Sequence, residues 1–591
     1  MRIKAWHAVA LISIVILAAY YPALSAPLNS VDDVMMVNDL MNRSGFTWQD
    51  FLFPSSKSYY RPLINSSFIL DRFLWNLEAP FLHLENLLLH LFNTLMVFMI
   101  ARRGSAFLNL KENHAPLAAA LLFGVHPINT EAVIWVAGRA DLMAGCFVLL
   151  TVFCTFNYLQ SRNSLWATGA ALMFFLGCLA KETTLLIWPG VLLAGFLASR
   201  VPGRWDARPD FPLRRALIPA FYCSFSIAGY FFIRSIALRD TDLGVRHVSA
   251  VLGTNAGSSK AVVKSSFDPA LLLEKLEKAT TVSGFYLRKI LQPFPLNFGI
   301  TEVPETYFWL GLVLVFTCLF LLLRPSWAGW FFLSAVSLGS IALLVAFGGI
   351  SWTPVAERYM YVPSAMASVG FVLAGARALQ GKAAAWHFVS FGLLCGVLLV
   401  SASGVFQRAL VWQDNVTLFE DTVKKSPGFK MGHNELAMAL MQRGDRERAM
   451  EIMRNLDIPE FQVASLNKVS VWVADGEYEK AHDYLIERLK NPHAYRRVIL
   501  ERLVMVLRNM AAAAHEKADV IALQGEMLHY LRELWKTTHD PFYLYRLGRL
   551  HMNMGDYDQA QLAFAEAYRL FPETSIYKQP SGRLAEAMKS P

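Results

Sequence analysis

Two adjacent carboxylates, Asp32 and Asp33, lie directly after the first long apolar run of the chain. A carboxylate in this position could act as the general base that removes a proton from an acceptor hydroxyl, or as a ligand for a divalent cation. The pair could instead cap the helix expected to begin near Val34, because aspartate side chains accept hydrogen bonds from the first N–H groups of a helix. We consider both aspartates candidate catalytic residues, and the sequence leaves the need for a metal open.

Further ionisable side chains gather where other apolar runs end. Charges beside hydrocarbon are costly, so they usually pair with each other or serve a function. Lys181 and Glu182, which stand between two apolar runs, are open to both interpretations. The candidate substrate-binding residues are Arg61, His126, Glu131, Arg139, Lys181, Glu182, Glu357, Arg358 and Tyr359.

Arginine is well suited to bind a phosphate, because its planar fork of N–H donors matches the phosphate oxygens. We expect Arg358 to be held by its neighbour Glu357 and thereby oriented toward a phosphate group. Arg139 could bind substrate in the same way, or it could simply form an ion pair with Asp141.

The apolar run around residue 90 also carries polar side chains at helical spacing. His83, Asn86, His90 and Asn93 would form one stripe, which could face a substrate or form hydrogen bonds with neighbouring helices. The sequence contains no glycine-rich phosphate loop, Walker-type lysine or zinc-ligand spacing, which argues against a nucleotide-driven pump.

The elements that must position these residues are membrane-spanning helices. Of the 591 residues, 55% are hydrophobic and only 17% are charged, which is too apolar for one soluble globule of this size. A helix needs about 20 apolar residues to cross the hydrocarbon. We predict an all-α membrane domain over residues 1–404 with about eleven spans, at 5–24, 81–101, 115–127, 141–159, 165–181, 183–198, 216–236, 306–323, 327–347, 360–376 and 387–404.

The positive charge of the chain supports one orientation of these helices. The formal net charge is +9, and the basic residues gather in short loops as membrane topology requires, so we do not expect nucleic-acid binding. With eleven spans these loops share the cytoplasmic side of the cell (inner) membrane. The loops 25–80 and 237–305 and the C-terminal domain are then extracytoplasmic. Residues 278–298 suit an interfacial helix; if they span the membrane, the C-terminal domain is cytoplasmic.

A second domain is predicted over residues 431–591, after a linker at 405–430. Three copies of one pattern combine a glycine, an acidic residue and an alanine: Gly444, Asp445 and Ala449; Gly476, Glu477 and Ala481; Gly555, Asp556 and Ala560. The pattern matches the tetratricopeptide repeat (TPR), in which small residues lie where paired helices touch. The second and third copies are far apart, so we expect a degenerate helical hairpin near 498–540.

The motifs and their order resemble the transmembrane and tetratricopeptide-repeat containing (TMTC-like) O-mannosyltransferases and their bacterial relatives, from about residue 30 to the C-terminus. The motifs that carry the resemblance are Asp32-Asp33, Tyr60-Arg61-Pro62, the stretch from His83 to His90, His126-Pro127, Thr130-Glu131-Ala132-Val133, Gly138-Arg139-Ala140-Asp141, Lys181-Glu182 and the stretch from Pro354 to Tyr359, followed by the repeats.

The resemblance implies an inverting GT-C glycosyltransferase that transfers mannose or another hexose to a protein hydroxyl. The sugar donor would be a polyprenyl phosphate in the membrane lipid. It further implies that a carboxylate of Asp32-Asp33 deprotonates the acceptor and that Arg358 binds the lipid phosphate, with Arg139 and Lys181 as second candidates. The TPR region would present the acceptor polypeptide.

Two other functions stay open at this point. One is a membrane-anchored TPR scaffold for envelope partners, in which the polar residues are structural. The other is a transporter or lipid flippase, but the sequence lacks the two related halves with interrupted helices that this would require.

Overall fold

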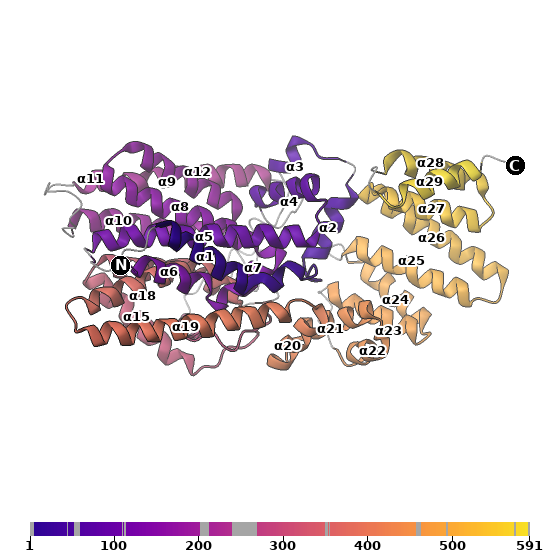
Figure 1. Ribbon diagram of the computed structural model, residues 1–591. Coiled ribbons are helices and arrows are strands. Elements are labelled where there is room, and N and C mark those ends of the chain that lie inside the picture. Colours follow the sequence, from indigo (N-terminus) through magenta and orange to yellow (C-terminus); the bar gives the residue numbers. More distant parts are fainter. Residues whose placement is uncertain are drawn as a thin grey trace. The chain divides into compact units, whose positions relative to one another are not determined.

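The computed structural model describes residues 5–43, 45–52, 60–108, 110, 114–200, 212–238, 269–348, 353, 355–456, 463–491, 495–571 and 575–588. Residues 239–268 of the predicted loop 237–305 lie outside the described residues, as do Trp352 and Pro354. The described part of the chain is helical, with one isolated β-bridge (Figure 1). It divides into two compact units, one of residues 1–33 and 48–429 and the other of residues 34–47 and 430–591.

The first unit is a bundle of long apolar helices connected by short helical turns. Its helices are α1 (Ala5–Tyr20), α3 (Trp48–Leu52), α4 (Pro62–Trp75), α5 (Ala79–Phe107), α6 (Ala115–Gly124), α7 (Thr130–Ile134), α8 (Arg139–Ser161), α9 (Ser164–Ala180), α10 (Trp188–Arg200), α11 (Leu213–Ala216), α12 (Ile218–Ala237), α14 (Pro269–Leu291), α15 (Tyr307–Leu323), α16 (Trp327–Gly339), α17 (Ile341–Gly348), α18 (Tyr361–Leu379), α19 (Ala384–Val411) and α20 (Asn415–Lys425), and its 3₁₀ helices are η1 (Tyr21–Ser25), η2 (Pro127–Asn129), η3 (Val136–Gly138), η4 (Glu182–Ile187) and η5 (Glu357–Met360).

Seven helices among the described residues are long and apolar enough to cross a membrane. A bent pair at 115–134 would make an eighth, and three shorter apolar helices lie at 164–180, 307–323 and 327–343. Together these helices coincide with the eleven predicted segments, although the number of spans stays a prediction. Helix α14 is not among the candidate spans found in the described residues, and its placement at the interface stays a prediction.

The direction of the helices gives the bundle two chemically different ends. Near the ends of α5 and α8, Arg103 donates a hydrogen bond to Gln160, and Tyr158 donates one to the Arg215 carbonyl at 2.7 Å. We call this the basic end. The site end is where α1, α6 and α9 finish and where α5, α8 and α18 begin, and the candidate site residues of the sequence lie there.

Residues 405–429, predicted as a linker, form the end of α19 and all of α20 and belong to the first unit. The Arg408 guanidinium, which is 6% exposed, forms a 2.5 Å ion pair with Asp421 across the turn between these helices. Leu418 and Phe419 are buried in the same unit. The C-terminal part of the second unit therefore begins at Lys430.

The second unit consists of helix pairs and includes α2 (Asp33–Asn42) from the first loop. Its other helices are α21 (Lys430–Arg443), α22 (Arg446–Arg454), α23 (Lys468–Ala474), α24 (Tyr478–Leu489), α25 (Arg496–Ala513), α26 (Lys517–Thr538), α27 (Pro541–Asn553), α28 (Tyr557–Leu570) and α29 (Lys578–Ala587). The predicted repeat is confirmed: Gly444, Gly476 and Gly555 have φ of 94°, 78° and 79° between paired helices, a conformation that glycine adopts without strain. Helices α25 and α26 are the degenerate hairpin expected near 498–540.

Candidate functional site

Asp33 is fully buried at the site end of the bundle and is tied to two other segments. Its carboxylate accepts hydrogen bonds from the N–H groups of Asn29 at 3.0 Å and of Ala137 at 2.9 Å. Neither bond goes to the first turn of α2, so the alternative that Asp33 serves as a helix cap is wrong. Burial raises the pKa of Asp33 to about 7, although the backbone N–H groups act in the opposite direction. Asp33 therefore fixes the turn that carries Asp32.

Asp32 has different surroundings, although it is the adjacent residue. Its side chain is half-buried, and no hydrogen bond to it is found within the described part of the chain. Burial raises the pKa of the Asp32 carboxyl above its ordinary value, and the charges of Arg358 and Arg61 partly offset that rise. The Asp32 carboxylate thus has no hydrogen-bond partner among the described residues and feels the charge of two arginines. A general base needs to be available in this way.

Arg358 is held by Glu131 from a distant part of the chain. The two side chains form an ion pair, and Glu131 also accepts the Arg358 backbone N–H at 3.2 Å. On the other side, the guanidinium donates to the Thr353 hydroxyl at 3.2 Å and to the Tyr359 hydroxyl at 3.4 Å. Its Nε–H and the second hydrogen on Nη1 have no partner among the described residues, so donors remain for a ligand.

The expectation that Glu357 holds Arg358 is wrong. Glu357 forms its own ion pair with Lys289 at 2.7 Å, and it is 2% exposed. Consecutive side chains on the 3₁₀ turn η5 diverge, so neighbours in the sequence point to different partners.

Two further ion pairs lie close to this arginine. Lys181 contacts Asp141 at 2.6 Å, and Arg61 contacts Glu182 at 2.5 Å. The alternative in which Arg139 pairs with Asp141 is therefore wrong. Lys181 also lies 6.0 Å from the centre of the Tyr359 ring, and the Arg358 guanidinium lies 4.9 Å from the same centre.

Arg139 is buried within a separate network that attaches α4 to the bundle. It forms an ion pair with Asp71 of α4 and another with Glu85 of α5 at 2.8 Å. Its guanidinium also lies 4.2 Å from the centre of the Phe68 ring. These contacts assign Arg139 a role in holding the first loop against α5 and α8.

Both ring nitrogens of His126 are engaged with backbone. Its Nε2 lies 2.9 Å from the Ile290 carbonyl, and its Nδ1 accepts the Ile128 N–H at 3.2 Å. An imidazole held on both sides is a positioning group for the turn that carries Glu131, and it has no nitrogen left for proton transfer.

The polar stripe on α5 also serves contacts between helices. Asn86 donates to the Trp135 carbonyl at 2.9 Å, and His90 bridges the Tyr361 hydroxyl and the Gly124 carbonyl, both at 2.9 Å. For these two residues the alternative of hydrogen bonding between helices is confirmed.

Comparisons with known proteins show the same combination of parts. A model of the tetratricopeptide repeat matches residues 541–574. The protein O-mannosyl-transferase Tmtc2 of Drosophila melanogaster is 40% identical over 137 residues, which is 22% of this chain and 14% of that protein. Over longer alignments, the protein O-mannosyl-transferases F38B6.6 of Caenorhabditis elegans and Tmtc1 of Drosophila melanogaster are 24% and 25% identical, covering 66% and 71% of this chain. The chain is thus similar to these TMTC proteins over about two thirds of its length.

The long alignments cover 52% and 57% of those two proteins, so the chain spans a little over half of the length of these TMTC relatives.

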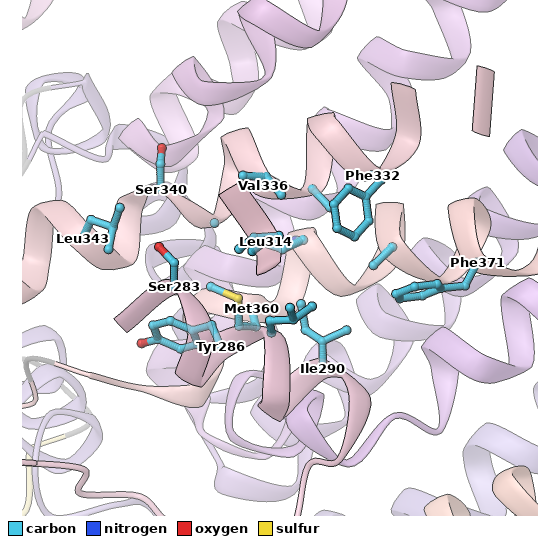
Figure 2. A pocket seen from close by; sticks show the side chains of 15 residues that line it. Ser283, Tyr286, Ile290, Leu314, Phe332, Val336, Ser340, Leu343, Met360 and Phe371 are labelled. Carbon is cyan, nitrogen blue, oxygen red and sulfur yellow. The ribbon is translucent and has the colours of Figure 1, made fainter. Parts of the chain in front are cut away.

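An apolar pocket of about 110 Å³ lies beside the site end of the bundle (Figure 2). Its walls come from α14, α16 and α18, with Tyr286, Phe332 and Phe371 among the lining residues. Met360 lines it as well, and it stands on the same turn η5 as Arg358. The pocket therefore begins within one helical turn of the arginine.

Three residues of the site end were not predicted from the sequence. Lys289 and Asn297 contact Glu357, and Asp71 holds Arg139. The charges that interrupt the apolar stretch at 278–298 were the only signal for Lys289. Among the described residues, no group of three or more histidine, cysteine, aspartate or glutamate side chains could hold a metal ion.

Proposed function

We propose that this protein is a membrane-embedded glycosyltransferase that moves a hexose, most simply mannose, from a polyprenyl-phosphate donor to a protein hydroxyl. Its TMTC relatives are named protein O-mannosyl-transferases, which supports the type of group transferred. The observation that carries the proposal is the unengaged Asp32 carboxylate in the field of Arg358 and Arg61. It combines a base with a cationic binding region at one end of a membrane bundle.

In the proposed reaction Asp32 accepts the proton of the acceptor hydroxyl while that oxygen bonds to the anomeric carbon. The bond between this carbon and the phosphate oxygen breaks, and its electron pair stays on the phosphate, so the configuration at the anomeric carbon inverts. The leaving phosphate gains negative charge, which the open N–H donors of Arg358 stabilise in the transition state. Arg61 and Lys181 lie in the same region, each paired with a carboxylate.

Glu131 and Thr353 would hold the arginine in position before the donor arrives. A guanidinium that is already fixed loses little conformational freedom on binding, so more of its interaction energy reaches the transition state. Asp33 has the corresponding role for the base, because it ties the Asp32 turn to Ala137.

The apolar pocket suits the hydrocarbon chain of the donor. Its lining is mainly aliphatic and aromatic, and Met360 connects it to the turn that carries Arg358. A phosphate at the arginine would thus leave the adjoining isoprenoid units next to a surface of matching chemistry.

We further propose that the site faces the extracytoplasmic side and that the TPR unit presents the acceptor polypeptide. The basic end of the bundle would then be cytoplasmic, in keeping with the distribution of arginine and lysine between short loops. The second unit includes residues 34–47, which follow Asp33 directly, so the catalytic turn continues along the chain into that unit.

The test is transfer by purified protein in lipid nanodiscs. Radiolabelled polyprenyl-phosphate mannose and glucose are supplied separately, with a serine- and threonine-rich polypeptide as acceptor. Label should appear on the polypeptide with one donor and not with the corresponding nucleotide sugar. Absence of transfer from every lipid donor, together with retained capture of envelope proteins by the TPR unit, would instead support the scaffold function.

A further inference from the structure

We infer that Lys289 and Glu357 form a positioning pair, which fixes the backbone of Arg358 and joins two walls of the apolar pocket. The inference rests on the proposed function, because it concerns how the donor phosphate and its lipid chain are held in register. Neither residue is assigned contact with the substrate.

Three consecutive residues before Arg358 are each anchored to α14 or to the loop after it. Val355 forms a backbone bridge with Ile300. The Tyr286 hydroxyl of α14 donates to the Ala356 carbonyl and accepts the Ala356 N–H, both at 3.1 Å. Glu357 contacts Lys289, so the whole approach to the arginine is held from one side.

The ion pair itself is saturated with hydrogen bonds. The Lys289 ammonium, on a side chain that is 4% exposed, contacts Glu357 at 2.7 Å and donates to the carbonyls of Pro293 and Pro295. The same Glu357 oxygen accepts the Asn297 N–H at 3.1 Å. Removing one partner of a buried pair leaves the other charge unpaired in the interior, so this pair restricts the loop to one arrangement, whereas an exposed pair would contribute little.

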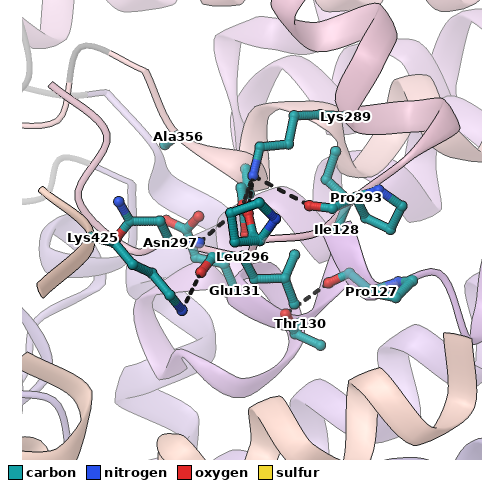
Figure 3. Close-up of polar contacts among 12 residues, drawn as sticks. Pro127, Ile128, Thr130, Glu131, Lys289, Pro293, Leu296, Asn297, Ala356 and Lys425 are labelled. Carbon is teal, nitrogen blue, oxygen red and sulfur yellow. Dashed lines mark hydrogen bonds and ion pairs between the residues drawn. The ribbon is translucent and has the colours of Figure 1, made fainter. Parts of the chain in front are cut away.

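The loop between α14 and α15, which carries Pro293, Pro295 and Asn297, is also held from its other side. Lys425 of α20 donates to the Leu296 carbonyl at 2.7 Å, and the Asn297 amide donates to Ser426 at 2.9 Å. Figure 3 shows Lys289 reaching toward Pro293 while Lys425 approaches Leu296 from a different element. Because these contacts hold the loop in place, the loop cannot shift to compensate for a lost ion pair. The turn η5 would be displaced instead.

The position of the pair relative to the pocket gives it a consequence for the donor. Tyr286 and Ile290 of α14 line the pocket on one side. Met360 of the turn η5 lines it as well. Lys289 and Glu357 connect these two walls at the site end. Arg358 stands between Glu357 and Met360, so a displacement of η5 would move the phosphate ligand and the pocket wall together.

The experiment compares donor binding by wild-type protein and by the double variant Lys289→Met with Glu357→Gln, each as the full chain in nanodiscs. Replacing both charges leaves no unpaired buried ion, whereas a single replacement would destabilise the fold and so confuse the result. Binding of a fluorescent polyprenyl phosphate is measured by titration, and the thermal midpoint is measured on the same samples.

We expect the double variant to stay folded and to bind the long-chain probe with a dissociation constant on the order of tenfold to a hundredfold higher, because small displacements of positioning groups have effects of this size. The KM for the acceptor should not change. The single variant Lys289→Arg should keep most of the wild-type affinity for the probe, since arginine keeps the charge opposite Glu357. The control variant, Arg103→Met with Gln160→Met, breaks a polar contact at the basic end and should bind the probe as the wild type does.

The outcomes separate this inference from the proposed function. Unchanged affinity in a folded double variant would reduce the pair to a structural role and overturn the inference alone. Failure of the wild-type protein to bind polyprenyl phosphate would overturn the proposed donor and this inference with it.

Discussion

Replacing Asp32 with asparagine should separate the roles of the two adjacent aspartates, because the structure gives them different surroundings. The Asp32 carboxyl has no hydrogen bond among the described residues, whereas Asp33 accepts two. Asp32→Asn keeps the shape of the side chain and removes its ability to accept a proton. We therefore expect a protein that folds normally and transfers almost no sugar.

The size of the effect follows from the role. Loss of a general base costs on the order of 10²- to 10⁴-fold in rate, which is about 3–5 kcal/mol of activation free energy. Asp33→Asn should behave in the opposite way. It leaves one of two buried N–H groups facing an amide NH₂, at a cost in stability of about 1–3 kcal/mol, and it should reduce the rate by less than about tenfold because the base is still present.

The assay measures initial rates of transfer from labelled polyprenyl-phosphate sugar in nanodiscs, with thermal melting on the same preparations. Binding of unlabelled polyprenyl phosphate serves as the control, and Asp32→Asn should leave it within about threefold of the wild type, because the substitution removes no donor hydrogen bond. Full activity in Asp32→Asn, or a loss confined to Asp33→Asn, would refute the assignment of Asp32 as the base.

Three other predictions use the same protein. The pKa of Asp33 is raised to about 7 from an ordinary value near 4, so its contribution to stability is present below that ordinary value and is lost as pH rises through 7; thermal melts should show higher stability at pH 5 than at pH 8, and Asp33→Asn should remove the difference. Arg358→Lys keeps the charge but not the planar fork, so the KM for the lipid donor should rise about 10- to 100-fold while the KM for the acceptor is constant; equal changes in both constants would contradict a donor role. In a background without the six native cysteines, Trp48→Cys at the site end and Ala383→Cys at the basic end, both exposed, should react with an impermeant maleimide from opposite sides of the membrane, and labelling of both from one side would contradict the proposed topology.

The helical elements were largely predictable because the lipid imposes a simple requirement on them. A spanning segment must be long, apolar and helical, and this can be seen in the sequence without knowledge of neighbours. The repeat was predictable for a related reason. Gly444, Gly476 and Gly555 adopt a backbone conformation that favours glycine, so their local geometry marks the turns directly.

The positions of the candidate site residues were also predictable, but their pairing was not. Asp32, Glu131 and Arg358 were identified because ionisable residues at span ends need a reason to be there. Which charge meets which depends on helix packing, and the ion partners lie far apart in the chain. Arg358 and Glu131 are separated by 227 residues, and Arg61 and Glu182 by 121. Local proximity suggested Glu357 and Asp141 as partners, and both suggestions were wrong.

The corrected pairing changes what the site can do. Had Glu357 held Arg358, the guanidinium would have been oriented within the single turn η5 and would have moved with that turn. Instead Glu131 holds the guanidinium from α7 while Glu357 anchors the backbone to α14 through Lys289. The position of the Arg358 guanidinium therefore depends on where α7 and α14 lie relative to each other. Because α14 also forms a wall of the apolar pocket, occupation of that pocket by a lipid chain and alignment of the phosphate ligand would be one event, which is how a membrane enzyme could favour a lipid-linked donor over a free sugar phosphate.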